Sequence, residues 1–171
     1  VWILGSSLYG AQLAAMLGLP YAFASHFAPA ELDRALAIYR ERFQPSGLLE
    51  KPYAMAGLNV VVAETDAQAR YLFTSSQQAF INIRSGRPGR LPPPIDDIGP
   101  LLEGPAGAML SQVLTHAVVG SPETVRRGLA AFVERTGVDE VIVTSQIYDH
   151  AARVRSYELL AGVRDAMAAA A

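Results

Sequence analysis

Short apolar runs alternate along the chain with longer stretches in which apolar residues recur every three or four positions. The runs contain β-branched and aromatic residues and are bounded by Gly, Ser or Asp, a pattern typical of buried strands. The longer stretches have the period of amphipathic helices. The pattern predicts strands at about 1–4, 21–25, 58–62 and 139–144, and helices from the serines at 6–7 to Gly18, from Pro29 to Gln44, over about 67–81, from Pro122 to Gly137 and over about 150–168.

Each predicted strand is followed by a predicted helix, so a strand–helix unit is repeated four times. This order favours an α/β fold with a parallel sheet covered by helices. Two architectures remain open at this point: a doubly wound open sheet, and half of a (β/α)8 barrel. A complete barrel takes ~250 residues, so a chain of 171 residues holds only about half of one.

The pattern breaks between Ile83 and Pro105, where Gly and Pro are dense and no period persists. A loop of this length inside a compact domain is typical of a lid, a binding loop or a disordered stretch. Three arginines, Arg84, Arg87 and Arg90, lie in its first part. Two interpretations remain: a lid-like loop at about 84–105 whose cations draw an anionic group inward, or a solvated loop whose charges serve solubility.

The composition argues against several function classes. The chain has 14 basic and 16 acidic residues and a formal net charge of −2, so nothing indicates the basic face of a nucleic-acid-binding protein. There are no cysteines, which excludes disulfides, thiolate metal sites and cysteine nucleophiles. The three histidines have no carboxylate at ligand spacing, so no metal site is expected. No apolar run reaches the roughly 20 residues of a membrane span and no signal peptide is visible, so we expect no membrane association and a cytoplasmic location.

The first ten residues carry the strongest candidate for a binding site. An apolar run ends at Gly5, and Ser6 and Ser7 then lead into a helix that contains Tyr9 and Gly10. Unpaired backbone N–H groups beside small hydroxyl side chains at a helix start favour a phosphate. The dinucleotide-binding fingerprint does not fit, because its middle glycine is absent and no acidic residue ends the second strand. A phosphate pocket and an ordinary serine-capped turn both remain open.

Among the histidines, His26 has the most informative position. It lies at the carboxyl end of the second predicted strand, where a barrel places its chemistry. Three roles are open for it: lining a ligand pocket, carrying a proton, or simply opening a helix. We expect His116 to pack or form a hydrogen bond at the start of a short apolar segment, and His150 to face solvent at the start of the last helix.

Three segments resemble the bacterial-luciferase-like flavin monooxygenases. SSLYGAQLAAMLGLPYAFASHFAP, residues 6–29, is similar to a signature of that family. Val119–Val125 resembles its V-G-[ST]-P-E segment, and Gly137–Val141 resembles its G-V-D-x-[VIL] entry to the last strand. The segments follow in the family's order and span nearly the whole chain. The resemblance implies strands five to eight, the C-terminal half of a (β/α)8 barrel, forming one partial domain over residues 1–171.

The resemblance also implies a cofactor, which is reduced FMN or, in some branches of the family, the deazaflavin F420. By their places in the motif, Ser6 and Ser7 would hold the flavin phosphate, and Tyr9 and Gly10 would offer backbone contacts. Many relatives carry an acidic or other polar residue where Ser6 stands. The arginine-bearing loop would correspond to a mobile lid, and His26 is the candidate catalytic residue.

The activity that the resemblance implies is oxidation of a small organic substrate by reduced FMN and O2, with a flavin reductase supplying the reduced FMN. The chain opens inside a strand without an initiator Met, so we expect a fragment that needs its missing N-terminal half or a homodimer partner to cover two sheet edges. One alternative is a non-catalytic flavin- or phosphate-ligand-binding protein of the same fold. Another is an open-sheet domain that binds a nucleotide or a sugar phosphate.

Overall fold

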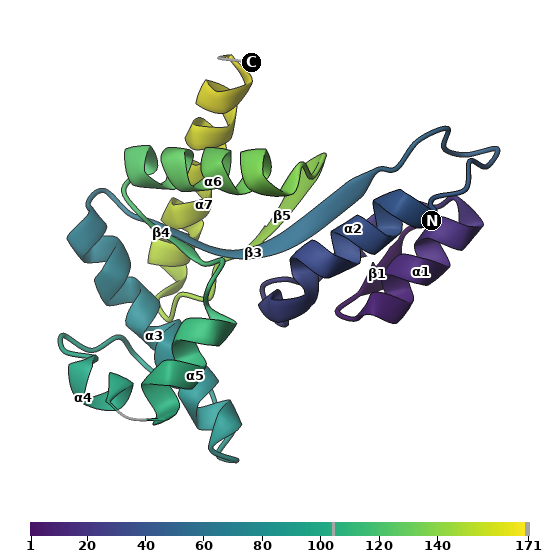
Figure 1. Ribbon diagram of the computed structural model, residues 1–171. Helices are drawn as coiled ribbons and strands as arrows, with labels where there is room; N and C mark the ends of the chain where they lie inside the picture. The colour runs from purple at the N-terminus through teal and green to yellow at the C-terminus, as the bar shows by residue number, and fades with distance from the viewer. Residues whose placement is uncertain (104, 170–171) are drawn as a thin grey trace. The chain divides into compact units, whose positions relative to one another are not determined.

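Strands and helices alternate along the chain in the computed structural model, which describes residues 1–103 and 105–169 (Figure 1). The first-half elements are β1 (Ile3–Gly5), α1 (Leu8–Leu17), β2 (Tyr21–Phe23), the 3₁₀ turn η1 (Pro29–Glu31), α2 (Leu32–Arg42), β3 (Ala54–Val62) and α3 (Asp66–Arg84). The others are α4 (Gly99–Leu102), α5 (Pro105–Val113), β4 (Val118–Gly120), α6 (Pro122–Thr136), β5 (Glu140–Thr144) and α7 (His150–Ala168).

The strands pair in parallel. β1 pairs with β2, and β2 pairs with the first residues of β3, in a register that sets Gly5 opposite Phe23 and Phe23 opposite Ala56. The last residues of β3 pair in parallel with β4, and β5 also pairs with β3. The predicted parallel α/β fold is therefore confirmed. Within the described part of the chain, no helix has both the length and the apolar character that crossing a membrane requires.

The chain divides into two compact units, and β3 runs from one into the other. The first unit contains residues 1–58, 113–116 and 132–144. The second contains residues 59–112, 117–131 and the chain from 145 on. That the whole chain acts as one partial domain stays a prediction.

An aromatic cluster forms the core of the first unit, where α1 and α2 lie side by side (Figure 1). Tyr21 and Tyr39 are fully buried, with ring centroids 5.3 Å apart. The Tyr39 hydroxyl donates to the Leu19 carbonyl at 2.8 Å and accepts from the Tyr53 amide at 3.1 Å. One buried hydroxyl thereby satisfies a backbone group of the α1–β2 connection and one of the α2–β3 connection, as buried polar atoms require.

The end of α6 is fixed within the first unit. Gly137 has a φ of +60°, which a glycine adopts without steric penalty, and it ends the helix where the sequence predicts. The guanidinium of Arg40 on α2 donates to the carbonyls of Thr136 and Gly137 at 2.8 and 2.6 Å. These bonds satisfy carbonyls that have no partner inside the helix.

The structure corrects the limits of the irregular region. α3 continues to Arg84 instead of ending near residue 81, so Arg84 lies in a helix and not in the loop. The stop is Gly86, whose φ is +70°. Gly86 N bonds to Ile83 O and Arg87 N bonds to Asn82 O, the pairing that closes a helix at a left-handed glycine. The short helix α4 then interrupts the segment that the sequence predicts as one continuous loop.

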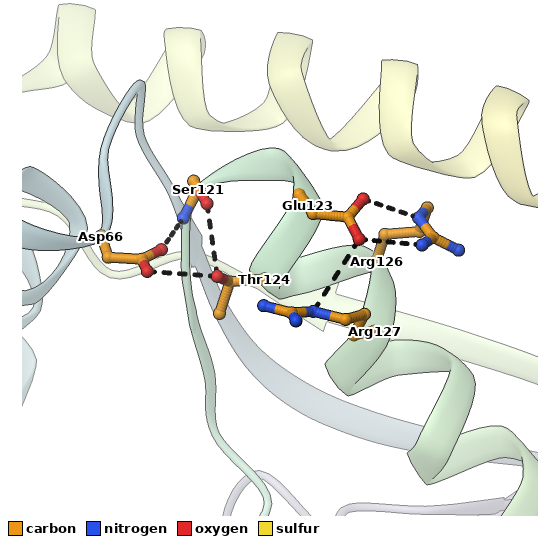
Figure 2. Close-up of polar contacts among 6 residues, drawn as sticks. All are labelled: Asp66, Ser121, Glu123, Thr124, Arg126 and Arg127. Atoms are coloured by element: carbon orange, nitrogen blue, oxygen red, sulfur yellow. Dashed lines mark hydrogen bonds and ion pairs between the residues drawn. The ribbon is translucent and has the colours of Figure 1, made fainter.

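A carboxylate caps the start of α6 in the second unit. Ser121 stands just before Pro122, as predicted, but Asp66 of α3 also serves this helix end (Figure 2). Asp66 Oδ1 accepts from the Ser121 amide at 2.6 Å, and Oδ2 accepts from the Thr124 hydroxyl at 3.2 Å. Hydrogen bonds from the Ser121 backbone, then from the Ser121 and Thr124 side chains, lower the pKa of Asp66. The ionised carboxylate therefore holds α3 and α6 together.

We expect Asp66→Asn to lower the midpoint of thermal unfolding by a few degrees at neutral pH. A carboxyl whose pKa is lowered in the folded state stabilises that state above its unfolded pKa, and the effect fades as pH falls through the folded pKa. The difference between the variant and the parent chain should therefore shrink in acid. Scanning calorimetry at neutral and acidic pH measures it, with Glu134→Gln, an exposed change on α6, as the control. An equal loss at both pH values would contradict the prediction.

Candidate functional site

The turn between β1 and α1 leaves a helix start open. Ser7 is the N-cap residue, with extended backbone angles of −140° and 166°, and among the described residues its hydroxyl receives no capping bond from the helix. The N-caps of α3 and α7 behave differently. The Thr65 side chain accepts from Gln68 N at 3.2 Å, and the Asp149 side chain accepts from Ala152 N at 2.8 Å. The first-turn N–H groups of α1 are thus left available for a ligand.

The turn packs closely against Gly5 and Tyr21. Gly10 is buried, and a Cβ added to it would lie 3.5 Å from both the Gly5 Cα and a ring carbon of Tyr21. The Tyr21 hydroxyl donates to the Ser7 carbonyl at 3.4 Å, a long contact. Burial raises the pKa of Tyr21, so this hydroxyl keeps its proton and remains a donor. The ring and hydroxyl of Tyr21 therefore contact this turn.

The four predicted cofactor-binding residues come together in this one turn. Ser7 and Tyr9 are exposed, Ser6 is half-buried and Gly10 is buried. Two hydroxyl side chains and the first amides of α1 are grouped at the positive end of its dipole, and residues 8–11 bring no carboxylate to oppose an anion. This donor set suits the oxygens of a phosphate.

His26 emerges from the neighbouring strand end. Because Gly5 is paired with Phe23, and Ala24 N donates to Gly5 O at 2.9 Å, the residues after β1 and those after β2 leave the sheet at the same edge. His26 is half-buried. Burial lowers its pKa, and a backbone hydrogen bond with Gly57 partly offsets this. The imidazole is therefore neutral at neutral pH.

The sequence did not identify two residues that fix this histidine. Ser25 is 1 % exposed, and its hydroxyl donates to the Gly57 carbonyl at 2.6 Å. Gly57 lies within the buried strand β3, beside the His26 ring. A glycine inside an apolar strand often marks a close approach of another group, and this signal would have pointed to Gly57.

The other two histidines have different surroundings. His116 is half-buried in the first unit, with its ring centroid 5.6 Å from that of Phe132. Burial, with a smaller effect from Arg135, lowers its pKa, consistent with the packing role that we expect. His150 is exposed at the start of α7, and its Nδ1 lies 3.0 Å from a guanidinium nitrogen of Arg153.

The predicted lid residues lie in the second unit. Arg87 and Arg90 are exposed in the irregular segment, whereas Arg84 is the last residue of α3. Beyond Arg90 the segment is tied to α3, because Gln78 Nε2 donates to Pro93 O at 3.0 Å and Ile95 N donates to the Thr74 hydroxyl at 2.9 Å. The role of the three arginines as a lid stays a prediction.

Comparison with known proteins gives consistent matches. A family model described as luciferase-like monooxygenase matches residues 1–140. A luciferase-like monooxygenase of Escherichia coli K12 is 49% identical over 165 residues, which are 96% of this chain and 49% of that protein. The crystal structure of apo-MsnO8 is 33% identical, with a TM-score of 0.79 over 96% of this chain and 50% of that one.

A more distant structure shows the same fold. The oxygenating constituent of 3,6-diketocamphane monooxygenase from Pseudomonas putida, solved in complex with FMN, is 21% identical with a TM-score of 0.57. That match covers 94% of this chain and 46% of that one. The chain spans about half the length of the relatives that it matches. On the family-model match and the identity to the Escherichia coli protein, the chain belongs to the luciferase-like monooxygenase family.

Proposed function

We infer that the chain contributes to a flavin-dependent oxidoreductase, which oxidises a small organic substrate with reduced FMN and O2. The observation that carries this proposal is the uncapped start of α1, with exposed Ser7, at the carboxyl end of a parallel strand. Membership of the luciferase-like monooxygenase family supports it, because flavin is the cofactor that the resemblance implies.

The residues at the turn fit the phosphate of a flavin. An anion needs N–H and O–H donors without a competing carboxylate. The starts of α3, α6 and α7 already hold a capping side-chain oxygen, from Thr65, Asp66 and Asp149. Among the described residues, the starts of α1, α2 and α4 have no such bond. At α1, Ser6 and Ser7 add hydroxyls without capping the helix, and no acidic residue lies in the first turn.

In this proposal the protein binds and orients while the flavin, when bound, supplies the redox chemistry. The Ser6 and Ser7 hydroxyls and the first amides of α1 donate to the phosphate. Tyr21 holds the turn in place through the Ser7 carbonyl.

FMN is the first choice of cofactor, because the structurally similar 3,6-diketocamphane monooxygenase component was solved with FMN. F420 is the second choice. A flavin reductase is proposed as the source of reduced FMN. A non-catalytic flavin- or phosphate-binding role would retain the same turn, and it would show itself as saturable binding without substrate oxidation.

We expect Ser7→Ala to weaken FMN binding about tenfold, the effect of losing one charge-assisted hydrogen bond. Riboflavin lacks the phosphate, so its affinity should not change. Fluorescence titrations with FMN, F420 and riboflavin measure both, and Ser111→Ala, an exposed change on α5, is the matched control. If neither this chain nor the full-length protein binds FMN or F420 saturably, the proposed function is contradicted.

The exposed edge of the sheet supports a proposal about partners. In the described part of the chain β1 pairs with β2 alone, and Val1 and Leu4 are 94 % and 72 % exposed. An unpaired apolar edge favours a further strand. We propose that a second copy of the chain, or an N-terminal half of the protein, supplies that strand.

We expect the isolated chain to self-associate as its concentration rises. Leu4→Arg should weaken that association several-fold, because it places a charge on the apolar edge. Sedimentation velocity over a concentration series measures the effect, and Leu48→Arg, which changes another exposed leucine, is the control. A chain that stays monomeric throughout would rule out the homodimer.

A further inference from the structure

Gly57 leaves room for an imidazole on the backbone of β3. A Cβ at this position would lie 2.9 Å from the His26 Cε1 and closer still to Nδ1, nearer than real side chains approach. The φ of Gly57 is not in the left-handed region, so the backbone does not require glycine. Apart from Met55, which is half-buried, every residue of β3 is buried. The space taken by the His26 ring is what requires a glycine here.

Ser25, the residue before His26, also bonds to Gly57. Its buried hydroxyl donates to the Gly57 carbonyl at 2.6 Å, so the carboxyl end of β2 is bound to the middle of β3. Phe27 N and Ala28 N both bond to Ala24 O at 3.0 Å, which closes a tight turn around His26. Both the backbone and the ring of this histidine are therefore held.

The ring also lies at a useful separation from the Ser6–Gly10 turn. β1, β2 and β3 are consecutive neighbours. The His26 ring beside Gly57 of β3 is therefore two strand spacings, about 10 Å, from β1, which ends at Gly5 just before Ser6 and Ser7. In FMN a five-carbon ribityl chain separates the phosphate from the isoalloxazine ring. A flavin whose phosphate lies at the start of α1 can therefore reach His26 with the polar edge of its ring.

We propose that His26 accepts a hydrogen bond from the ring edge of the flavin, and that Gly57 and Ser25 position it. This inference rests on the proposed function. Nδ1 is the buried ring nitrogen beside Gly57, and in this proposal Nε2 is the nitrogen that contacts the flavin. The N3–H group of isoalloxazine is a donor of matching chemistry for the Nε2 lone pair of a neutral imidazole.

The protonation of His26 gives the contact a pH dependence. The contributions to its pKa are burial, which lowers it, and the Gly57 backbone hydrogen bond, which raises it; neither is a charged side chain. The net direction is below the usual value of 6.5. Protonation turns Nε2 from an acceptor into a donor, so flavin affinity should fall as pH drops through this pKa. In the His26→Gln variant, the amide oxygen is an acceptor that does not titrate.

The test is FMN titration of the full chain, followed by fluorescence from about pH 5 to about pH 8. His26→Leu should weaken FMN binding about tenfold at neutral pH. The FMN affinity of His26→Gln should stay within about threefold of that of the parent chain. Its pH dependence should be smaller, with only the contribution of the phosphate remaining. Gly57→Ala should weaken binding as His26→Leu does, because it displaces the ring. His150→Gln is the control, and the imidazole proton resonances of His26 should shift when FMN is added.

Each outcome decides between two statements. If Ser7→Ala weakens FMN binding but His26→Leu does not, the phosphate turn stands and the His26 contact is wrong. If neither this chain nor the full-length protein binds FMN or F420, the proposed function fails, and the His26 contact fails with it. Thermal melting checks the folding of each variant. Should Gly57→Ala fail to fold, the His26→Leu and His26→Gln pair still decides.

Discussion

Parallel pairing of β1, β2 and β3 is the constraint on which the candidate site depends. It places every strand's carboxyl end at one edge of the sheet, so the residues that follow Gly5 and Phe23 meet although 18 positions separate them. A slip of one residue would turn each side chain to the other face. Ser6, Ser7 and His26 would then no longer leave the sheet together. Strand register thus converts two short polar segments into one possible ligand site.

The helix starts differ in whether a side chain caps their first N–H groups. Thr65, Asp66 and Asp149 close the starts of α3, α6 and α7, where the helices serve the scaffold. The N-cap Ser7 of α1 makes no side-chain capping bond within the described part of the chain. Such a bond in general contributes about 1 kcal/mol to stability. Packing of Gly10 against Gly5 and Tyr21 holds the helix start in place instead. The contrast suits a binding turn, because a capping side chain occupies one of the first-turn N–H groups that a phosphate would use.

Local signals predicted the elements, and non-local contacts account for what was missed. Apolar periodicity, Thr65 as an N-cap and Gly137 as a stop are properties of a few adjacent residues, and the structure confirms them. The Asp66 cap on α6 joins residues 55 positions apart, and the Ser25 bond to Gly57 joins residues 32 apart. No pattern within one element specifies such pairs. The extension of α3 to Arg84 was missed for a different reason, since Gly86 could be interpreted equally as a loop residue or as the end of a helix.

Gly57 bears on the role of His26. Glycine within a strand is destabilising by roughly 0.5–1 kcal/mol relative to alanine, and the backbone angles here do not demand it. A histidine that served only to fill space could be replaced by an apolar side chain, with alanine at position 57 and no buried hydroxyl at Ser25. The chain instead combines a strand glycine, a buried serine and a neutral imidazole at the sheet edge that carries Ser6 and Ser7. The His26 ring explains the glycine, and the Ser25 bond to Gly57 joins β2 to β3. The proposed flavin contact adds a reason for an imidazole, rather than an apolar side chain, at this edge.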